Sequence, residues 1–367
     1  MSTRVRTALI GYGKASFMHA EALKNIPEVE FVGVQGRNLE KAKAFAQKYQ
    51  VNAYDQLDQM ISKENIQVVI ICTPHPDHRS AAVQAMEAGA HVLVEKPLAS
   101  SLKDCDEMIA TAIRMNKKLG VVSQRRFFPS AMRMKKAIVE GKIGQPMLGS
   151  VVMLGWRDQS YYEGDAWRGT WNGEGGGVLV NQAPHQLDLL QWYMDDEIDE
   201  LYGIWKNINH PYIEVDDTAL AILKFKKGAV ANILVSNSQK PGIYGKVHIH
   251  GSNGASVGVE TDRGAMFIAG LSTIVQPPTN DIWTIPGEEK NLKRWEEEDA
   301  AFFQSIDAIE YYIRLQDRDF ILAASNGSEP LITGIEGRKT VEIFTAIYRS
   351  SRDQKPVKWP IKAESLK

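Results

Sequence analysis

Short apolar runs alternate with amphipathic stretches over the first third of the chain. Runs of strand length occupy residues 5–10, 30–34, 68–72, 91–94 and 119–123. Helical spacing of apolar positions marks residues 39–49, 79–88 and 102–115. Gly89 stands where the second of these helices should end. Strands that alternate with helices predict βαβ units and a parallel sheet with helices on both faces.

The pattern changes near residue 124. Residues 131–140 have helical periodicity and end at Gly141, and residues 295–315 and 335–349 also have a helical pattern. Strand-like segments form two reversals, 217–225 with 229–236 and 246–250 with 255–260. We therefore expect an α/β chain with two domains. Residues 1–124 would form the parallel-sheet domain, and residues 125–367 an α+β domain with a mostly antiparallel sheet.

Length and composition fit an ordinary two-domain globular protein. The chain has 367 residues, of which 44% are hydrophobic and 24% charged. Its net charge of −2 lacks the basic surplus of a nucleic-acid binder. No apolar run reaches the roughly 20 residues of a membrane span, and no signal-peptide core follows the N-terminal charges. The two cysteines, Cys72 and Cys105, cannot build a disulfide framework. We expect a cytoplasmic protein without a nucleic-acid or membrane partner.

A glycine-rich turn, Gly11-Tyr12-Gly13-Lys14-Ala15-Ser16, follows the first apolar run. Gly11 would permit the tight turn, and Gly13 would let the backbone approach a pyrophosphate at the N-terminus of the next helix. Ser16 replaces the third glycine of the dinucleotide fingerprint but is small enough for close helix packing. The position of the turn at the start of the βαβ series favours a Rossmann domain that binds a dinucleotide through residues 11–16.

The end of the second strand bears on the choice between NAD and NADP. An acidic residue there would bind the ribose 2′-hydroxyl and favour NAD. This chain has Gln35-Gly36-Arg37-Asn38 instead. Arg37 is either a ligand of adenine or of a 2′-phosphate, or a solvated turn residue. We expect NADP or NAD as the cofactor, with NADP favoured.

A charged pair follows the apolar run 91–94, in the sequence Glu95-Lys96-Pro97. Ligands of open α/β sheets bind outside the carboxyl ends of the strands, so a Glu-Lys pair at this position is well placed to take part in catalysis. The alternative is a surface ion pair at the end of a strand.

The second domain carries the glycine run Gly175-Gly176-Gly177, followed by Asn181 and His185. The glycines permit a close backbone approach before a helix. Asn181 and His185 are four residues apart, which an unbroken helix would place on one face. Pro184 would instead kink or end such a helix. His185 is either functional or a histidine of the core.

Aromatic and charged side chains are interleaved between residues 156 and 171. They are Trp156, Arg157, Asp158, Tyr161, Tyr162, Asp165, Trp167, Arg168 and Trp171. Such a mixture suits a pyranose, which offers apolar ring faces and a rim of hydroxyls. The alternative is a packed loop or subunit contact with ordinary Arg–Asp pairs.

Two further groups of residues do not predict a metal site or a nucleophile. His75, Asp77 and His78 lie on a proline-containing loop with poor ligand geometry, and the sequence has no Cys-rich or His-rich cluster. We therefore expect no metal. Cys72 is expected to be buried beneath the cofactor loop rather than to act as a nucleophile.

Together these motifs resemble the Gfo/Idh/MocA oxidoreductases. The resemblance rests on Gly11-x-Gly13 with His19, Thr73-Pro74 with His78, Glu95-Lys96-Pro97 and the glycine run leading to His185. It continues through Asp217-Thr218 to Pro356. It implies a Rossmann domain and a mixed-sheet domain whose open face builds homodimers or homotetramers. It also implies a cis Lys96-Pro97 bond.

The resemblance assigns roles to particular residues. Lys96 and His185 would form the catalytic pair. The resemblance implies an aspartate at the position of Asn181, and this replacement puts a carboxylate relay in doubt. The Asn181 amide can still orient a hydroxyl by hydrogen bonding. The expected cofactor contacts are Gly11, Tyr12, Gly13, Lys14, Ala15, Ser16, Gly36, Arg37, Thr73, Pro74, His78, Glu95, Lys96 and Gln124. The expected substrate contacts are Lys96, Trp156, Arg157, Tyr162, Trp167, Arg168, Asn181 and His185.

The expected function is hydride transfer between NAD(P) and a secondary hydroxyl or ketone of a sugar, glycoside, anhydrosugar or cyclic polyol such as inositol. His185 would take the hydroxyl proton while Lys96 stabilises negative charge on the oxygen. Two alternatives stay open. One is an enzyme that oxidises a sugar transiently during glycosidic-bond cleavage, and the other is a non-catalytic sensor, against which the retention of Lys96 and His185 argues.

Overall fold

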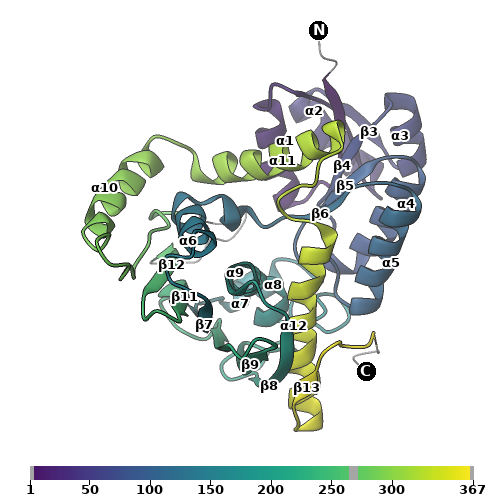
Figure 1. Ribbon diagram of the computed structural model, residues 1–367. Coiled ribbons are helices and arrows are strands. Elements are labelled where there is room, and N and C mark those ends of the chain that lie inside the picture. Colours follow the sequence, from purple (N-terminus) through teal and green to yellow (C-terminus); the bar gives the residue numbers. More distant parts are fainter. Residues whose placement is uncertain (1–3, 264–271, 364–367) are drawn as a thin grey trace. The chain divides into compact units, whose positions relative to one another are not determined.

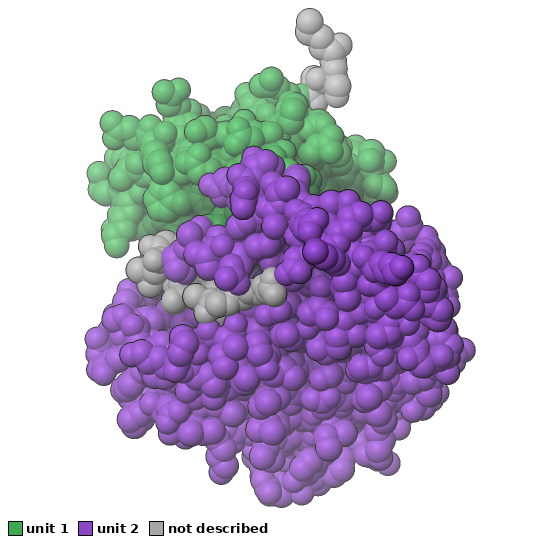
Figure 2. All heavy atoms as spheres, turned by 90° about the vertical axis from the view of Figure 1, so that its left-hand side faces the viewer, with its two compact units in different colours: residues 1–124, 309–338 green, residues 125–308, 339–367 purple. Residues whose placement is uncertain are grey.

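The computed structural model describes residues 4–263 and 272–363. These residues form two compact units, which Figure 2 shows in separate colours. The first unit comprises residues 1–124 and 309–338, and the second comprises residues 125–308 and 339–367. The sequence led us to expect one domain over residues 1–124 and another over residues 125–367; in the structure, residues 309–338 group with residues 1–124.

The first unit contains a six-stranded parallel sheet in the order β3-β2-β1-β4-β5-β6. Its strands are β1 (Val5–Ile10), β2 (Val29–Gln35), β3 (Asn52–Tyr54), β4 (Val68–Ile71), β5 (His91–Val94) and β6 (Leu119–Val121). This order confirms the expected Rossmann fold. The strand order reverses between β1 and β4, so ligands of such a sheet bind at the carboxyl ends of these strands.

Helices cover both faces of this sheet (Figure 1). They are α1 (Lys14–Lys24), α2 (Leu39–Tyr49), α3 (Leu57–Glu64), α4 (His78–Glu87), α5 (Leu102–Arg114) and α11 (Ala308–Asn326). Helices α1, α2 and α11 share one apolar core, while α4 packs between α3 and α5. The buried side chains Ile313, Phe320 and Ile321 of α11 belong to that core, which explains why this late segment returns to the first unit.

The second unit contains a seven-stranded sheet in the order β12-β11-β7-β10-β9-β8-β13. Its strands are β7 (Pro146–Leu154), β8 (Ile198–Lys206), β9 (Thr218–Phe225), β10 (Val230–Ser236), β11 (Tyr244–Gly251), β12 (Ser256–Arg263) and β13 (Val357–Lys358). All neighbouring strands are antiparallel except β7 and β10. The expected mostly antiparallel sheet is confirmed.

The helices of the second unit include two that pack on one face of this sheet. They are α6 (Pro129–Val139), α7 (Gln159–Glu163), α8 (Val178–Asn181), α9 (Pro184–Met194), α10 (Asn291–Gln304) and α12 (Gly334–Asp353), of which α12 begins in the first unit. Leu190 and Met194 of α9 lie against Gly149 of β7, and Ile347 of α12 lies against Gly203 of β8. The helical pattern of residues 295–315 belongs to two helices, because it spans the end of α10 and the start of α11.

The opposite face of β8 and β9 exposes apolar side chains. Tyr202 and Ile204 of β8 lie directly opposite Ile222 and Leu220 of β9, and their exposed fractions range from 37% to 61%. Their neighbours in sequence point to the covered face, as the period-two geometry of a strand requires.

Across the described residues, we find no helix that could span a membrane.

Candidate active site

The glycine turn after β1 leads into the N-terminus of α1. Gly11 has a φ of +106°, and a Cβ there would lie 2.9 Å from the Cys72 carbonyl oxygen, so glycine is required. Gly13 is the N-cap of α1, and a Cβ on it would meet no described atom within 4 Å. Among the described residues no side chain caps α1, whose first turn has no acidic residue. The first N–H groups of α1 can therefore bind an anion such as a pyrophosphate.

Two buried polar atoms lie at the carboxyl ends of strands in the same sheet. Thr73 follows β4, and Gln124 follows β6. Within residues 4–263 and 272–363, Thr73 Oγ1 and Gln124 Oε1 have no hydrogen-bond partner. Buried polar atoms of this kind are few in native proteins and call for a ligand or water. Together with the uncapped helix, they fit a bound dinucleotide.

Arg37 lies beyond the end of β2 and points into solvent. Its side chain is 83% exposed, and Nη2 lies 3.4 Å from Asp77 Oδ2 in a surface ion pair. Gly36 leaves room for the Tyr12 ring, because a Cβ on Gly36 would lie 2.1 Å from a ring carbon. The Tyr12 hydroxyl accepts a hydrogen bond from the Asn38 N–H at 3.3 Å. Tyr12 therefore packs under the turn that carries Arg37.

His78 connects the ends of β4 and β5 from within the protein. Its Nε2 lies 3.0 Å from the Thr73 carbonyl oxygen and its Nδ1 lies 2.9 Å from the Pro97 carbonyl oxygen. Burial lowers the pKa of His78, so a neutral ring donates to one of these oxygens. His78 is fully buried, so its role here is to place Thr73-Pro74 beside Pro97; its contact with a cofactor stays a prediction.

Glu95 and Lys96 follow β5 directly, at the same edge of the sheet. Both are partly buried, and the peptide bond between Lys96 and Pro97 is cis, as predicted. Glu95 Oε2 accepts the Lys96 backbone N–H at 3.0 Å, and Glu95 Oε1 lies 3.2 Å from His19 Nε2. The carboxylate is therefore held on both oxygens, so Glu95-Lys96 is not a solvated surface ion pair.

In the second unit, Asp216 holds the glycine run in place. Its carboxylate accepts the N–H groups of Gly177 at 2.7 Å and Leu179 at 2.9 Å, and the hydroxyl of Tyr348 at 2.6 Å. A Cβ on Gly177 would lie 1.8 Å from the Asp216 carbonyl oxygen. Gly177 is therefore glycine because the backbone of Asp216 leaves no space for a side chain there.

Asn181 and His185 lie on two different helices. Asn181 ends α8, while His185 is the second residue of α9, which Pro184 begins. The break at Gln182 and Ala183 excludes the single helical face that a four-residue spacing alone would give. Asn181 is buried, and His185 is partly exposed.

The hydroxyl of Tyr161 is the centre of a buried polar cluster beside Asn181. It accepts hydrogen bonds from Asn181 Nδ2 at 3.1 Å, from Gln182 Nε2 at 3.0 Å and from Arg168 Nη1. Asn181 Nδ2 also donates to the carboxylate of Glu174, which further accepts the Gly169 N–H at 2.7 Å. Sequence reasoning missed Glu174, which is 1% exposed; its place directly before the glycine run was the available signal.

The structure brings together most of the residues expected in a substrate wall. The Arg168 guanidinium lies over the Tyr161 ring at 4.3 Å and the Trp167 ring at 4.4 Å, and the Arg157 guanidinium lies 5.2 Å from the Tyr161 ring. Trp156 and Tyr162 are in turn neighbours of the His210 ring. Trp171 instead packs on Trp205 and Tyr348, so it belongs to a different aromatic cluster.

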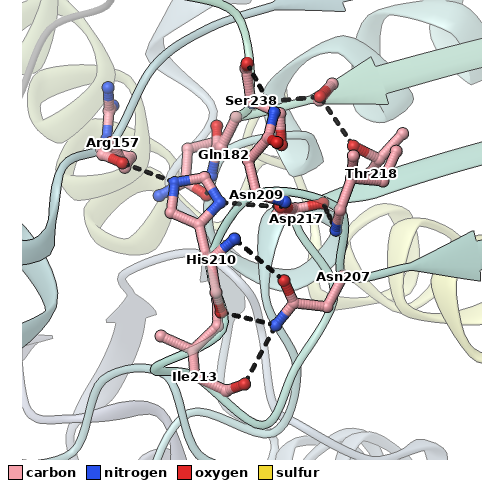
Figure 3. A network of polar contacts seen from close by, with 12 residues as sticks. Arg157, Gln182, Asn207, Asn209, His210, Ile213, Asp217, Thr218 and Ser238 are labelled. Carbon is pink, nitrogen blue, oxygen red and sulfur yellow. Dashed lines mark hydrogen bonds and ion pairs between the residues drawn. The ribbon is translucent and has the colours of Figure 1, made fainter.

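A second buried network fixes the backbone of Arg157 (Figure 3). His210 Nδ1 lies 2.7 Å from Asp217 Oδ2, and His210 Nε2 donates to the Arg157 carbonyl oxygen at 2.7 Å. Asp217 also accepts the N–H groups of Ile208 and Asn209. Burial would raise the pKa of Asp217, but these hydrogen bonds hold it well below its usual range. The Asp217-Thr218 motif therefore acts at a distance, through His210, on the segment that carries Arg157.

The side chains considered as metal ligands lie apart in the described part of the chain, where no three His, Cys, Asp or Glu side chains come together as a ligand set. His75 and His78 pack edge to face, with ring centroids 5.7 Å apart, and both are buried. Cys72 and Cys105 are buried free thiols, and burial raises the pKa of Cys72 well above its usual range.

Two sequence comparisons connect the chain to known proteins. Residues 5–123 match the profile described as "Oxidoreductase family, NAD-binding Rossmann fold", and residues 131–257 match "GFO/IDH/MocA C-terminal domain". The scyllo-inositol 2-dehydrogenase (NAD(+)) of Bacillus subtilis is 26% identical, with 99% of this chain and 98% of that protein covered. The 1,5-anhydro-D-fructose reductase of Ensifer adhaerens is 26% identical over 76% of this chain and 81% of its own.

A structural comparison gives a similar outcome. The WlbA dehydrogenase of Bordetella pertussis, in complex with NADH and UDP-GlcNAcA, is 26% identical, with a TM-score of 0.86 and 99% of both chains covered. Similarity over the whole length means that both compact units have counterparts in that protein.

Proposed function

The chain belongs to the Gfo/Idh/MocA family of NAD-binding oxidoreductases, and on this premise we propose that it transfers a hydride between a nicotinamide cofactor and a secondary hydroxyl or ketone of a sugar, glycoside, anhydrosugar or cyclic polyol. One observation carries the proposal. An uncapped helix N-terminus at Gly13 and the fixed Glu95-Lys96 pair lie at the same carboxyl edge of one parallel sheet. The inositol dehydrogenase and anhydrofructose reductase among its relatives support the class of substrate.

NAD(H) binding follows from the family and its Rossmann domain. We further propose that NADP(H) binds at least as well. No carboxylate stands at the end of β2, and Arg37 extends from there into solvent, where its guanidinium can meet a 2′-phosphate. The ion pair with Asp77 is an exposed one, so leaving it costs less than about 1 kcal/mol.

The reaction needs a group that takes the hydroxyl proton and a group that stabilises charge on the oxygen. We assign the first task to His185, because a neutral imidazole is a competent base near neutral pH. Lys96 supplies the positive charge that lowers the proton affinity of the oxygen. Asn181 orients the reacting hydroxyl through its amide. The bound nicotinamide supplies the hydride chemistry.

The open face of β8 and β9 supports a proposal on assembly. Four large apolar side chains, Tyr202, Ile204, Leu220 and Ile222, form cross-strand neighbours on an exposed sheet surface. A contiguous apolar surface of this kind marks a protein interface. We propose that a second copy of the chain covers this face in a homodimer or homotetramer.

We also propose a cytoplasmic location. Both cysteines are buried thiols that do not pair with each other, as is usual for proteins of a reducing compartment.

The function is tested by incubating the purified protein with NAD+ or NADP+ and a panel of inositols, aldoses, anhydrosugars and glycosides. We expect reduced cofactor to accumulate with at least one of these alcohols. A panel without any turnover, from protein that binds the cofactor, would contradict the proposed class of substrate.

A further inference from the structure

A buried row of three ionisable side chains joins α1, β5 and α11 within the first unit. His19 Nδ1 lies 3.0 and 2.9 Å from the two carboxylate oxygens of Asp317, and His19 Nε2 lies 3.2 Å from Glu95 Oε1. The side chains of His19 and Asp317 are 0% exposed, and that of Glu95 is 13% exposed. Burying ions costs several kcal/mol each unless they are well paired, so a row like this calls for a specific role.

The geometry fixes the protonation state of His19. Both ring nitrogens face carboxylates, so both must donate, which only the imidazolium can do. Burial alone would lower the pKa of His19, but Asp317 and Glu95 raise it to about 10. Burial would likewise raise the pKa of Glu95, yet the contact with His19 and the charge of Lys96 bring it below its usual value. His19 and Glu95 are therefore charged at neutral pH, while burial raises the pKa of Asp317 against the opposing charge of His19.

The row ends at the residues that the proposed reaction uses. Glu95 gives one oxygen to His19 and the other to the backbone N–H of Lys96. His19 lies in the second turn of α1, the helix whose N-terminus follows the glycine turn. The imidazolium thus links α1, whose N-terminus can bind the pyrophosphate, with the end of β5, where Glu95 and Lys96 follow. Neither His19 nor Asp317 is accessible to a ligand.

We propose that His19 and Asp317 are positioning residues that hold Glu95-Lys96 at the nicotinamide half of the cofactor site. The inference rests on the dinucleotide site of the proposed function and on no particular substrate. Loss of the row releases Glu95 and Lys96, so it weakens binding of the nicotinamide half. The adenosine half binds at Gly13 and the end of β2, so it keeps its affinity.

The test compares two ligands that differ in the nicotinamide half. NADH and ADP are titrated against the full-length protein, its His19→Gln variant and a control, His91→Gln. His91 lies at the opposite end of β5, where it accepts the Lys118 N–H at 2.9 Å. We expect His19→Gln to raise the Kd of NADH about tenfold or more, the equivalent of one lost charge-assisted hydrogen bond, and that of ADP less than about twofold.

Each other outcome decides against the inference. Equal losses for NADH and ADP would assign His19 to the general stability of the unit, and an unchanged Kd for NADH would leave it without a role in binding. A similar loss in His91→Gln would show that changing any histidine on this sheet has the same effect. Wild-type protein that binds neither ligand would overturn the proposed function as well.

A second variant keeps His19 and changes its charge. Asp317→Asn removes the carboxylate that raises the pKa of His19 most, so that pKa falls from about 10 towards neutrality. Glu95 is then the charged group that contacts the imidazole. Glu95 in turn interacts with Lys96 and with the Cys72 thiol, whose own pKa lies well above its usual range. The Kd of NADH should be flat from about pH 6 to about pH 9 in the wild type and should rise with pH in the variant. A variant with a flat profile would overturn the assignment of the imidazolium.

Discussion

The Asn181 amide donates from Nδ2 to the buried carboxylate of Glu174. The same nitrogen donates to the Tyr161 hydroxyl at 3.1 Å. Burial raises the pKa of Glu174, and the hydrogen bonds from Asn181 and Gly169 oppose this by favouring its ionised form. With Nδ2 donating to Glu174, the amide Oδ1 is directed away from that carboxylate. Glu174 thereby orients the residue that replaces the aspartate of the family.

Asn181→Asp would place a second carboxylate against Glu174. Two close carboxylates cannot both ionise cheaply, so the pair should bind a proton with a raised apparent pKa. Because the raised value belongs to the folded state, the variant should lose stability as pH rises through it, by roughly 1–3 kcal/mol. Thermal unfolding at several pH values measures this loss of stability. In turnover assays, the shape of the pH profile should change more than the maximal rate. The double variant with Glu174→Gln restores one donor and one acceptor, so it should recover; a double variant as unstable as the single one would contradict the pairing.

His185→Ala should lower kcat by roughly 10²–10⁴-fold, the usual contribution of a positioned general base. Its Kd for NADH should stay within about twofold, because His185 would touch the substrate hydroxyl. Lys96→Ala should lose a similar factor, and the double variant should lose less than the product of both, since the two groups act on one oxygen. His250→Ala, a partly buried histidine that bonds Ser256 at 2.7 Å, is the matched control. Near-normal turnover of His185→Ala would return His185 to the core.

Arg37 and Asp77 should set the preference between the two cofactors. Arg37→Ala should raise the Kd of NADPH about tenfold and leave that of NADH nearly unchanged, since only NADPH carries a 2′-phosphate. Asp77→Asn removes the carboxylate whose Oδ2 lies 3.4 Å from Arg37 Nη2 and competes with a phosphate for it. This variant should lower the Kd of NADPH about two- to fivefold. Fluorescence titration of the wild type and each variant with NADPH and with NADH measures these dissociation constants. Equal effects of Arg37→Ala on both cofactors would show that Arg37 does not bind a phosphate.

Ile222→Asp should dissociate the assembly, because it buries a charge in the middle of the apolar face of β8 and β9. Light scattering after size-exclusion chromatography should give the mass of an oligomer for the wild type and a smaller mass for the variant. Ile113→Asp changes an apolar side chain that is 75% exposed on α5, and it should leave the mass unchanged. An Ile222→Asp protein with the wild-type mass would place the interface elsewhere.

Asp217 should contribute to stability at neutral pH and lose this contribution in acid. Its pKa is lowered in the folded state, so the stabilisation exists above the unfolded value of about 3.9 and disappears as pH falls through the folded value. Asp217→Asn should reduce the free energy of unfolding by roughly 3–5 kcal/mol at pH 7, with a smaller difference in acid. Urea denaturation at both pH values measures it. Asp353→Asn, an exposed partner of Arg352, should have little effect, and equal losses at both pH values would contradict the role of the charge.

The Rossmann half could be predicted closely from the sequence because its signals are local. The predicted helix over residues 39–49 and the strand over residues 91–94 coincide with α2 and β5. The edge strand β3, of three residues, gave no pattern of its own. The cis bond at Pro97 was predicted from the resemblance rather than from any physical signal.

The contacts around the site were less predictable because they join distant residues. The spacing of Asn181 and His185 left open whether one helix carries both, and Pro184 decided it by beginning a new one. Glu174 and Asp317 carry no periodic signal as single acidic residues. Their importance comes from burial next to Asn181 and His19, which tertiary structure alone reveals. The catalytic roles of Lys96 and His185 stay predictions.

The return of residues 309–338 to the first unit has a consequence for synthesis of the chain. His19 and its partner Asp317 are 298 positions apart in sequence, so the ribosome synthesises residues 125–308 of the second unit before the carboxylate emerges. Until then the nascent first unit lacks the apolar side chains of α11 and one of the two carboxylates that face His19, with only Glu95 present. Folding in order of synthesis, usual for independent domains, can therefore yield only an incomplete unit. A fragment of residues 1–124, although it contains every strand of the parallel sheet, should expose apolar surface and depend on chaperones.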